Sequence, residues 1–294
     1  MLQLRHLTRR YGDHLAVDDI SFSVSAGQMV GFVGGNGAGK TTTMRMIMGV
    51  LAPTSGEVLW QGRPATAADR SRFGYMPEER GLYPKQPILD QLVYLGRLRG
   101  LSTTSARERA TELLRRFGLG DRLRAKVETL SLGNQQRGQI IASVLGDPVF
   151  LVLDEPFSGL DPAAVDAMTE LLREYTSAGV PVLFSSHQLD LVDRLCDSLV
   201  VLHQGRVVAA GTSADLRSEA PLRYRLVMAT DPTWVNDRPG ITVLERSPGT
   251  VVLQPADEPT AERLLVDAVA RGRVQEFARI VPTLADVYRE ATTA

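Results

Sequence analysis

A glycine-rich stretch at residues 34–42 holds the first residues that could do chemistry. It follows an apolar run at 28–33 that predicts a buried strand, and it precedes a segment at 43–48 that predicts a helix. Glycines let successive backbone N–H groups turn toward a polyanion, and the helix N-terminus adds partial positive charge. The pattern therefore predicts a phosphate-binding loop. Its expected binding residues are Gly34, Asn36, Gly37, Ala38, Gly39, Lys40, Thr41 and Thr42.

Lys40 and Thr41 carry the chemistry of this loop. In such a loop the lysine reaches the β- and γ-phosphates of a nucleotide, and the hydroxyl lies on Mg²⁺. Lysine is rare here, because arginines supply nearly all of the 33 basic residues. A compact ammonium fits a tight phosphate cradle in which a planar guanidinium would not. The alternative is a glycine-rich turn that matches by chance, and the flanking strand and helix argue against it.

Two acids, Asp154 and Glu155, follow a continuous apolar run at 149–153. Such a run fits a parallel strand covered on both faces, and ligands bind at the carboxyl end of strands in open α/β sheets. Asp154 would hold Mg²⁺ through its water shell, and Glu155 would polarise an attacking water. Two acids after a strand also fit a helix cap. The phosphate-binding loop earlier in the chain favours a shared site.

Four further polar positions lie near predicted helix or strand ends. Ser131 and Gly133 offer a hydroxyl and an N–H beside a helix N-terminus, which makes a second phosphate-facing surface or an ordinary N-cap. Asp161 precedes a proline and is expected to cap a helix. His187 follows an apolar strand, where its imidazole would either hydrogen-bond a γ-phosphate or serve the structure alone.

The composition is ordinary for a globular protein of 294 residues, with 44% hydrophobic and 23% charged residues. A formal net charge of −1 argues against a dedicated nucleic-acid-binding surface, so no nucleic acid is expected as a partner. Cys196 is the one cysteine, which excludes an internal disulfide and fits a reducing compartment. The N-terminus does not look like a signal peptide, and no apolar run reaches the ~18–20 residues needed to cross a bilayer. We expect a cytoplasmic protein whose membrane role, if any, comes through a partner.

Strands that alternate with helices predict an α/β sheet, which must position these residues. The first 33 residues alternate like an antiparallel β lead-in, and the region of about 85–145 is expected to be helical. There, Pro87 fits a first helical position and Ser105 is expected to begin a capping box that opens a second helix. The strand at 198–202 is expected to be the last strand of this α/β sheet.

Near Ser218 the pattern changes to that of a small α+β domain. Strands are expected at 222–228 and 241–253, followed by a helix. The expected domains are thus residues 1–217 and 218–294, and the second shows no catalytic constellation.

Taken in chain order, these motifs resemble the nucleotide-binding domain of ABC ATPases over roughly residues 1–217. The resemblance implies a P-loop NTPase fold that binds ATP with Mg²⁺ and hydrolyses it. Residues 34–42 match the Walker A motif and residues 130–135 match the signature motif. Asp154 and Glu155 match the Walker B aspartate and the catalytic glutamate.

The resemblance also implies roles for single residues. Tyr11 would stack on adenine, Asp161 would close the D-loop, and His187 would be the switch histidine. Ser131 and Gly133 would bind the γ-phosphate held by a second copy of the chain.

Two places depart from the family pattern. The signature usually reads Leu-Ser-Gly-Gly-Gln, whereas this chain has Leu132 and Asn134 at the third and fifth positions. Glu78 stands where the family has a glutamine. Its carboxylate can still ligate Mg²⁺, but it adds a negative charge beside the nucleotide.

Residues 74–85 and 281–288 narrow the resemblance to the ATPase subunits of bacterial ABC-2-type exporters. It implies a homodimer that closes on ATP and drives a separately encoded membrane permease through the region of residues 78–100. The chain would then lie on the inner face of the cell membrane. The alternative is a soluble ABC-family ATPase in translation or another non-transport role. Translation factors of this superfamily usually carry two such domains, and only one phosphate-binding loop occurs here.

Overall fold

The computed structural model describes residues 1–79, 81–219 and 221–293. The described chain divides into two compact units, Met1–Ser213 and Ala214–Thr293. The division falls close to, and slightly before, the expected boundary after residue 217. Among the described residues, no helix is both long and apolar enough to cross a membrane.

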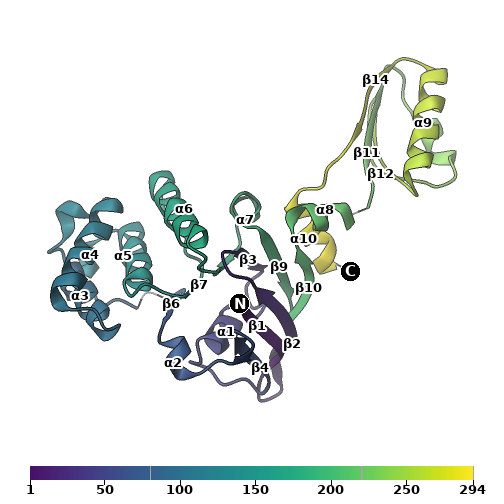
Figure 1. Ribbon diagram of the computed structural model, residues 1–294. Coiled ribbons are helices and arrows are strands. Elements are labelled where there is room, and N and C mark those ends of the chain that lie inside the picture. Colours follow the sequence, from purple (N-terminus) through teal and green to yellow (C-terminus); the bar gives the residue numbers. More distant parts are fainter. Residues whose placement is uncertain (80, 220, 294) are drawn as a thin grey trace. The chain divides into compact units, whose positions relative to one another are not determined.

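The first unit is built on a six-stranded sheet with the order β10-β9-β3-β8-β7-β6 (Figure 1). The central strands pair in parallel, and β10 pairs antiparallel to β9. Every residue of β3, β7 and β8 is buried, as expected for strands covered on both faces. The strands are β3 (Met29–Gly34), β6 (Phe73–Met76), β7 (Phe150–Leu153), β8 (Val182–Ser186), β9 (Ser198–His203) and β10 (Arg206–Gly211).

A second, antiparallel sheet forms the β lead-in and has the order β2-β1-β4-β5. Helix α1 (Lys40–Ile47) lies between the two sheets, and its methionines share one core with residues of both. The rings of Trp60, Phe73 and Phe150 meet at centroid distances of 5.0–5.8 Å in this core. The strands are β1 (Leu2–Tyr11), β2 (His14–Val24), β4 (Ser55–Trp60) and β5 (Arg63–Pro64).

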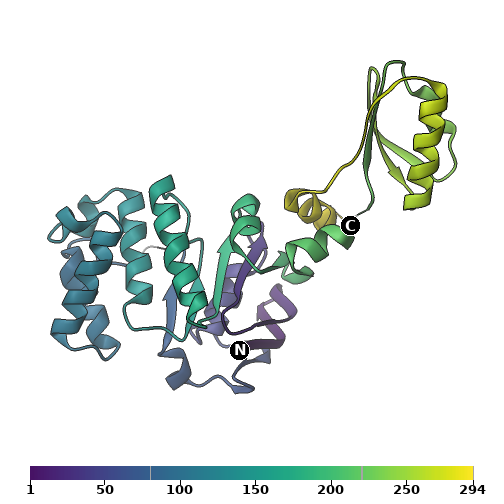
Figure 2. The same cartoon turned by 45° about the horizontal axis from the view of Figure 1, so that its top comes forward.

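Helices gather beside the β6 edge of the large sheet, where Figure 2 shows α3, α4 and α5 packed next to one another. Two predicted helix starts were wrong. Pro87 caps α3 instead of beginning it, and Ser102, not Ser105, caps α4 by accepting a hydrogen bond from Ser105 N. The helices are α2 (Ala67–Arg70), α3 (Ile88–Leu98), α4 (Thr103–Arg116) and α5 (Leu132–Val144), with 3₁₀ turns at Gly120–Arg122 and Val127–Thr129.

Helices α6 (Pro162–Ser177) and α7 (Leu189–Leu195) complete the first unit. Helix α7 packs on the face of β3 that bears Gly31. A Cβ at Gly31 would lie 2.4 Å from Cγ1 of Val192, so only glycine permits this close approach. The prediction that the strand at 198–202 is the last of this sheet was wrong, because β10 follows it and pairs with it as a hairpin.

The second unit contains a four-stranded antiparallel sheet with the order β12-β13-β11-β14. Helix α9 packs on it and shares a core with β11 and β13. The expected strands and helix are present, and α8 and β14 were not expected. The elements are α8 (Ser213–Glu219), β11 (Tyr224–Met228), a 3₁₀ turn (Thr233–Asp237), β12 (Ile241–Ser247), β13 (Thr250–Pro255), α9 (Glu258–Arg271), β14 (Val274–Arg279) and α10 (Leu284–Thr293).

Candidate nucleotide-binding site

A cavity of about 470 Å³ opens at the carboxyl end of β3 and β7. It joins the glycine-rich loop to the acids that follow β7, as expected for the binding edge of an α/β sheet. Its lining residues are Tyr11, His14, Ala16, Gly35, Asn36, Gly37, Ala38, Gly39, Lys40, Thr41, Thr42, Glu78, Asp154 and Glu155.

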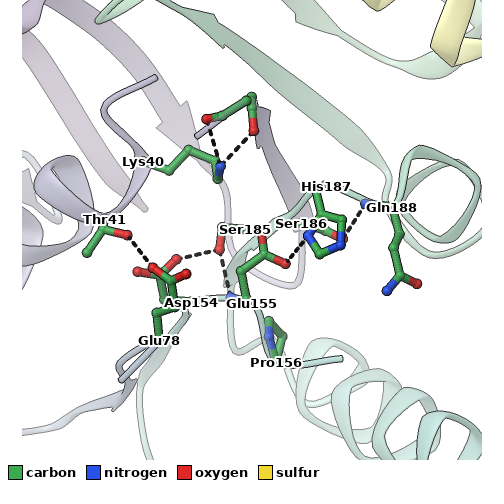
Figure 3. Close-up of polar contacts among 12 residues, drawn as sticks. Lys40, Thr41, Glu78, Asp154, Glu155, Pro156, Ser185, Ser186, His187 and Gln188 are labelled. Atoms are coloured by element: carbon green, nitrogen blue, oxygen red, sulfur yellow. Dashed lines mark hydrogen bonds and ion pairs between the residues drawn. The ribbon is translucent and has the colours of Figure 1, made fainter. Parts of the chain in front are cut away.

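The loop between β3 and α1 is held closed by its own lysine. Lys40 Nζ donates to the carbonyl oxygens of Gly34 at 2.6 Å and Gly35 at 3.3 Å, and the residue is only 9% exposed (Figure 3). Gly39 caps α1 with a φ of 100°, and a Cβ there would lie 2.7 Å from the carbonyl oxygen of Ala16. The backbone conformation and the space both require glycine.

Three carboxylates share the cavity with this single ammonium. Glu78 follows β6, and its Oε2 accepts a hydrogen bond from Thr41 Oγ1 at 3.3 Å. Asp154 and Glu155 follow β7. Sequence reasoning found Asp154 and Glu155 because they directly follow a predicted apolar strand, and it found Glu78 because the family that the chain resembles has a glutamine at that position.

Ser185 at the carboxyl end of β8 ties the two β7 acids together. Its hydroxyl donates to Asp154 Oδ1 at 2.6 Å and accepts from Glu155 N at 2.7 Å. Asp154 is 1% exposed, and its other oxygen, Oδ2, has no hydrogen-bond partner among the described residues. A buried carboxylate oxygen is costly to leave unpaired, so Oδ2 is suited to a cation or its water shell.

Glu155 and His187 form a pair beside the cavity. His187 Nδ1 lies 2.9 Å from Glu155 Oε2, and an ionised carboxylate only accepts, so the ring nitrogen is the donor (Figure 3). Glu155 adopts a φ of 50°, an uncommon conformation for a residue with a side chain. His187 itself does not line the cavity.

The remaining predicted site residues lie apart from the loop. Ser131 caps α5 and accepts a hydrogen bond from Asn134 N, while Gly133 lies against Gly159, whose oxygen would be 2.7 Å from an added Cβ. Asp161 caps α6 as expected, and its second oxygen accepts from Arg137 at 2.5 Å. None of these three predicted residues lines the cavity of its own chain.

Sequence reasoning missed Gln136, which joins α5 to the segment after β7. The side chain is 6% exposed, and its Nε2 donates to the carbonyl oxygens of Glu155 at 3.1 Å and Pro156 at 3.3 Å. No local pattern marks this contact, which only the packed structure reveals. Ser185 was also missed, although its position just before His187 at a strand end was a usable signal.

The cavity suits Mg²⁺ bound together with phosphates. Across the described residues there is no group of three or more His, Cys, Asp or Glu side chains that would hold a metal by themselves. Mg²⁺ commonly uses one or two carboxylates and completes its shell with water and phosphate oxygens. Asp154 Oδ2, Thr41 Oγ1 and Glu78 supply oxygens of that kind.

A phosphate-binding loop that follows β3 and opens α1, together with two acids that follow β7 of the same parallel sheet, defines a P-loop NTPase. The expected fold class is confirmed. A family model for ABC transporters matches residues 17–158, and one for the C-terminal domain of DrrA1-3-like ATP-binding proteins matches residues 211–292.

The chain belongs to the family of ABC transporter ATP-binding proteins. It is 39% identical to the ABC transporter ATP-binding protein YhaQ of Bacillus subtilis strain 168, over 100% of this chain and 99% of that protein. It is 37% identical to a Nod factor export ATP-binding protein of Cupriavidus metallidurans, over 74% and 72% of the two chains. It is 36% identical to the linearmycin resistance ATP-binding protein of B. subtilis, over 74% and 71%.

Solved structures agree with this assignment. The ATP-binding subunit of an ABC transporter superposes with a TM-score of 0.69 at 36% identity, covering 74% of this chain and 92% of that one. A dimeric bacterial ABC transporter cassette shares the fold, with a TM-score of 0.66 at 22% identity, over 72% and 98%. The protein is an ATP-binding, ATP-hydrolysing subunit of a transporter, and the alternative role in translation is not supported.

Proposed function

We propose that two copies of this chain pack head to tail around two Mg·ATP molecules and that the closing and opening of this dimer powers export through a separate membrane permease. The observation that carries the proposal is the single cavity that joins the Lys40 loop to Asp154 and Glu155.

In the first half of the site, the loop residues from Gly34 to Thr42 would surround the phosphates with backbone N–H groups. Lys40 would exchange the carbonyl oxygens of Gly34 and Gly35 for phosphate oxygens. Mg²⁺, held by Thr41, Asp154 and Glu78, would neutralise part of the phosphate charge. Tyr11 lines the same cavity, is 46% exposed and would stack on adenine.

Glu155 would orient and polarise the attacking water, and His187 would contact the γ-phosphate. Without nucleotide, His187 donates to Glu155. A γ-phosphate offers this imidazole a second anionic acceptor, so nucleotide binding would release the Glu155 carboxylate to accept a proton from water. The His187 side chain is 61% exposed and can make this exchange by rotation.

The second half of each site would come from the other copy. Ser131 and Gly133 lie outside the cavity of their own chain, and Leu132 between them is 61% exposed. In a two-fold dimer the same surface serves both subunits, so the α5 N-terminus of each copy would face the phosphates of the other. Asp161, next to Arg137 of α5, would lie at this interface.

The permease would contact the region of residues 78–100, where Tyr94 and Leu98 of α3 are exposed. The chain would thereby be held at the inner face of the cell membrane. Two of the relatives are named for Nod factor export and for linearmycin resistance. From the export named in the first, we propose that this chain also powers transport out of the cell.

Two variants test the proposal by light scattering and nucleotide titration. Lys40→Ala should lose nucleotide binding, because Lys40 is the one lysine among the described residues that line the cavity. Glu155→Gln should bind Mg·ATP, hydrolyse it slowly and accumulate as a dimer. A Glu155→Gln protein that binds Mg·ATP and stays monomeric would refute the sandwich. Affinity capture of the same variant from detergent-solubilised membranes should recover a polytopic protein.

A further inference from the structure

The cavity around the phosphate-binding loop carries an excess of negative charge. Glu78, Asp154 and Glu155 contribute three carboxylates, and Lys40 contributes the one ammonium among the described lining residues. ATP without a metal carries about four negative charges, and like charges brought together in a partly desolvated cavity repel. The loop N–H groups and the α1 N-terminus attract the phosphates of both forms, and this attraction does not favour the metal complex over free ATP.

From this arrangement we propose that Glu78 makes the site selective for the metal complex of ATP over free ATP. The inference rests on the proposed placement of the triphosphate at this loop, and it concerns which form of ATP, free or metal-bound, the site binds more tightly. A divalent cation between Glu78 and the phosphates turns a repulsive carboxylate into a ligand.

Glu78 is suited to this role by position. Its Oε2 accepts from Thr41 Oγ1 at 3.3 Å, and Thr41 directly follows the phosphate-binding lysine. Asp154 Oδ1 accepts from Ser185 and Glu155 Oε2 accepts from His187. These two carboxylates are thus hydrogen-bonded to side chains at the end of β8, whereas Glu78 is hydrogen-bonded to the residue next to the phosphate-binding lysine. Figure 3 shows the Glu78 carboxylate beside the Thr41 hydroxyl and apart from the His187 ring.

The effect has a bounded size. Glu78 is exposed, so water and salt screen its charge. A screened repulsion over several ångströms weakens the binding of the more highly charged, metal-free nucleotide by about three- to tenfold. Glu78→Gln keeps the shape of the side chain and an oxygen ligand while removing the charge. It should therefore bind metal-free nucleotide more tightly and change little in its affinity for the metal complex.

The test is isothermal titration with the non-hydrolysable β,γ-imido analogue of ATP, at fixed ionic strength, in excess Mg²⁺ and in excess EDTA. Glu79→Gln is the matched control, because it makes the same charge change one residue away and Glu79 does not line the cavity. We expect Glu78→Gln to lower the Kd for the metal-free analogue by about tenfold, with Glu79→Gln within about twofold of wild type.

Two results overturn the inference while leaving the nucleotide site intact. In the first, Glu78→Gln has the same ratio of metal-free to metal-bound Kd as wild type. In the second, Glu79→Gln changes this ratio as much as Glu78→Gln does. A wild-type protein that binds neither form would instead refute the proposed site itself, and the inference with it. Repeating the titrations at high salt should shrink the Glu78→Gln effect, since screening weakens the repulsion.

Discussion

Gln136 is a buried side chain whose loss should slow hydrolysis without weakening nucleotide binding. Gln136→Leu fills nearly the same space but removes the Nε2 donor to the carbonyl oxygens of Glu155 and Pro156. An unsatisfied buried acceptor costs about 1–3 kcal/mol. Because both oxygens share one donor nitrogen, we expect a loss of about 2–3 kcal/mol in the free energy of unfolding.

For a domain of this size, 1 kcal/mol lowers Tm by about 2–4 °C, so the expected fall is about 5–10 °C. The same change frees the backbone of Glu155, which is held at a φ of 50°. That strained conformation persists only while its surroundings support it. We expect kcat, measured by phosphate release at saturating Mg·ATP, to fall about tenfold, a loss of about 1.4 kcal/mol in transition-state stabilisation.

Gln91→Leu is the matched control, because Gln91 is also buried and also makes two hydrogen bonds, both to the backbone of Tyr83. It should lower Tm by a similar amount and leave kcat unchanged. The nucleotide Kd should stay within about twofold of wild type in both variants. If Gln136→Leu lowers Tm as expected but retains the wild-type kcat, its hydrogen bonds serve only stability and the reasoning fails.

Two further predictions concern the core and the thiol. Phe150→Ala should lower the free energy of unfolding by about 3–5 kcal/mol in a denaturant titration, because Phe150 is fully buried against Trp60 and Phe73, and a loss below about 1 kcal/mol would contradict that packing. Burial, with a smaller contribution from the charge of Asp197, raises the pKa of the Cys196 thiol well above its usual range. At pH 8 a disulfide reagent should therefore label native protein slowly and urea-unfolded protein at once, and fast native labelling would contradict the burial.

The parts of the fold that could be predicted depend on local sequence. The strand, glycine loop and helix around Lys40 are specified within about twenty residues, and the acids after β7 follow a run that is apolar throughout. Strand β10 was missed because residues 207–210 are all apolar, so its sequence shows no alternation of polar and apolar residues, and because its pairing with β9 depends on the hairpin between them. The N-cap of α4 was misplaced because residues 102–105 are all hydroxyl-bearing, so more than one of them could begin the helix.

The residues of the candidate site could likewise be predicted only in part. The loop residues and the two acids after β7 were identified by their types and order. Tyr11 and Glu78 were identified through the family resemblance, and the lining residues His14 and Ala16 were missed.

The links between these residues join distant segments. Ser185 bonds to Asp154, and Gln136 bonds to Glu155, across contacts that arise only when β8 and α5 pack beside β7. Spacing in the chain does not predict such contacts.

The closed loop around Lys40 has a thermodynamic consequence. Because the ammonium already holds the carbonyl oxygens of Gly34 and Gly35, the loop is ordered before a nucleotide arrives. Binding then exchanges one set of acceptors for another and requires little ordering of the chain. Nucleotide should therefore stabilise the fold by mass action alone, by about 2.7 kcal/mol at a concentration one hundred times Kd. At protein concentrations low enough to keep the chain monomeric, a melting series against ATP concentration would then report Kd with no separate contribution from loop folding.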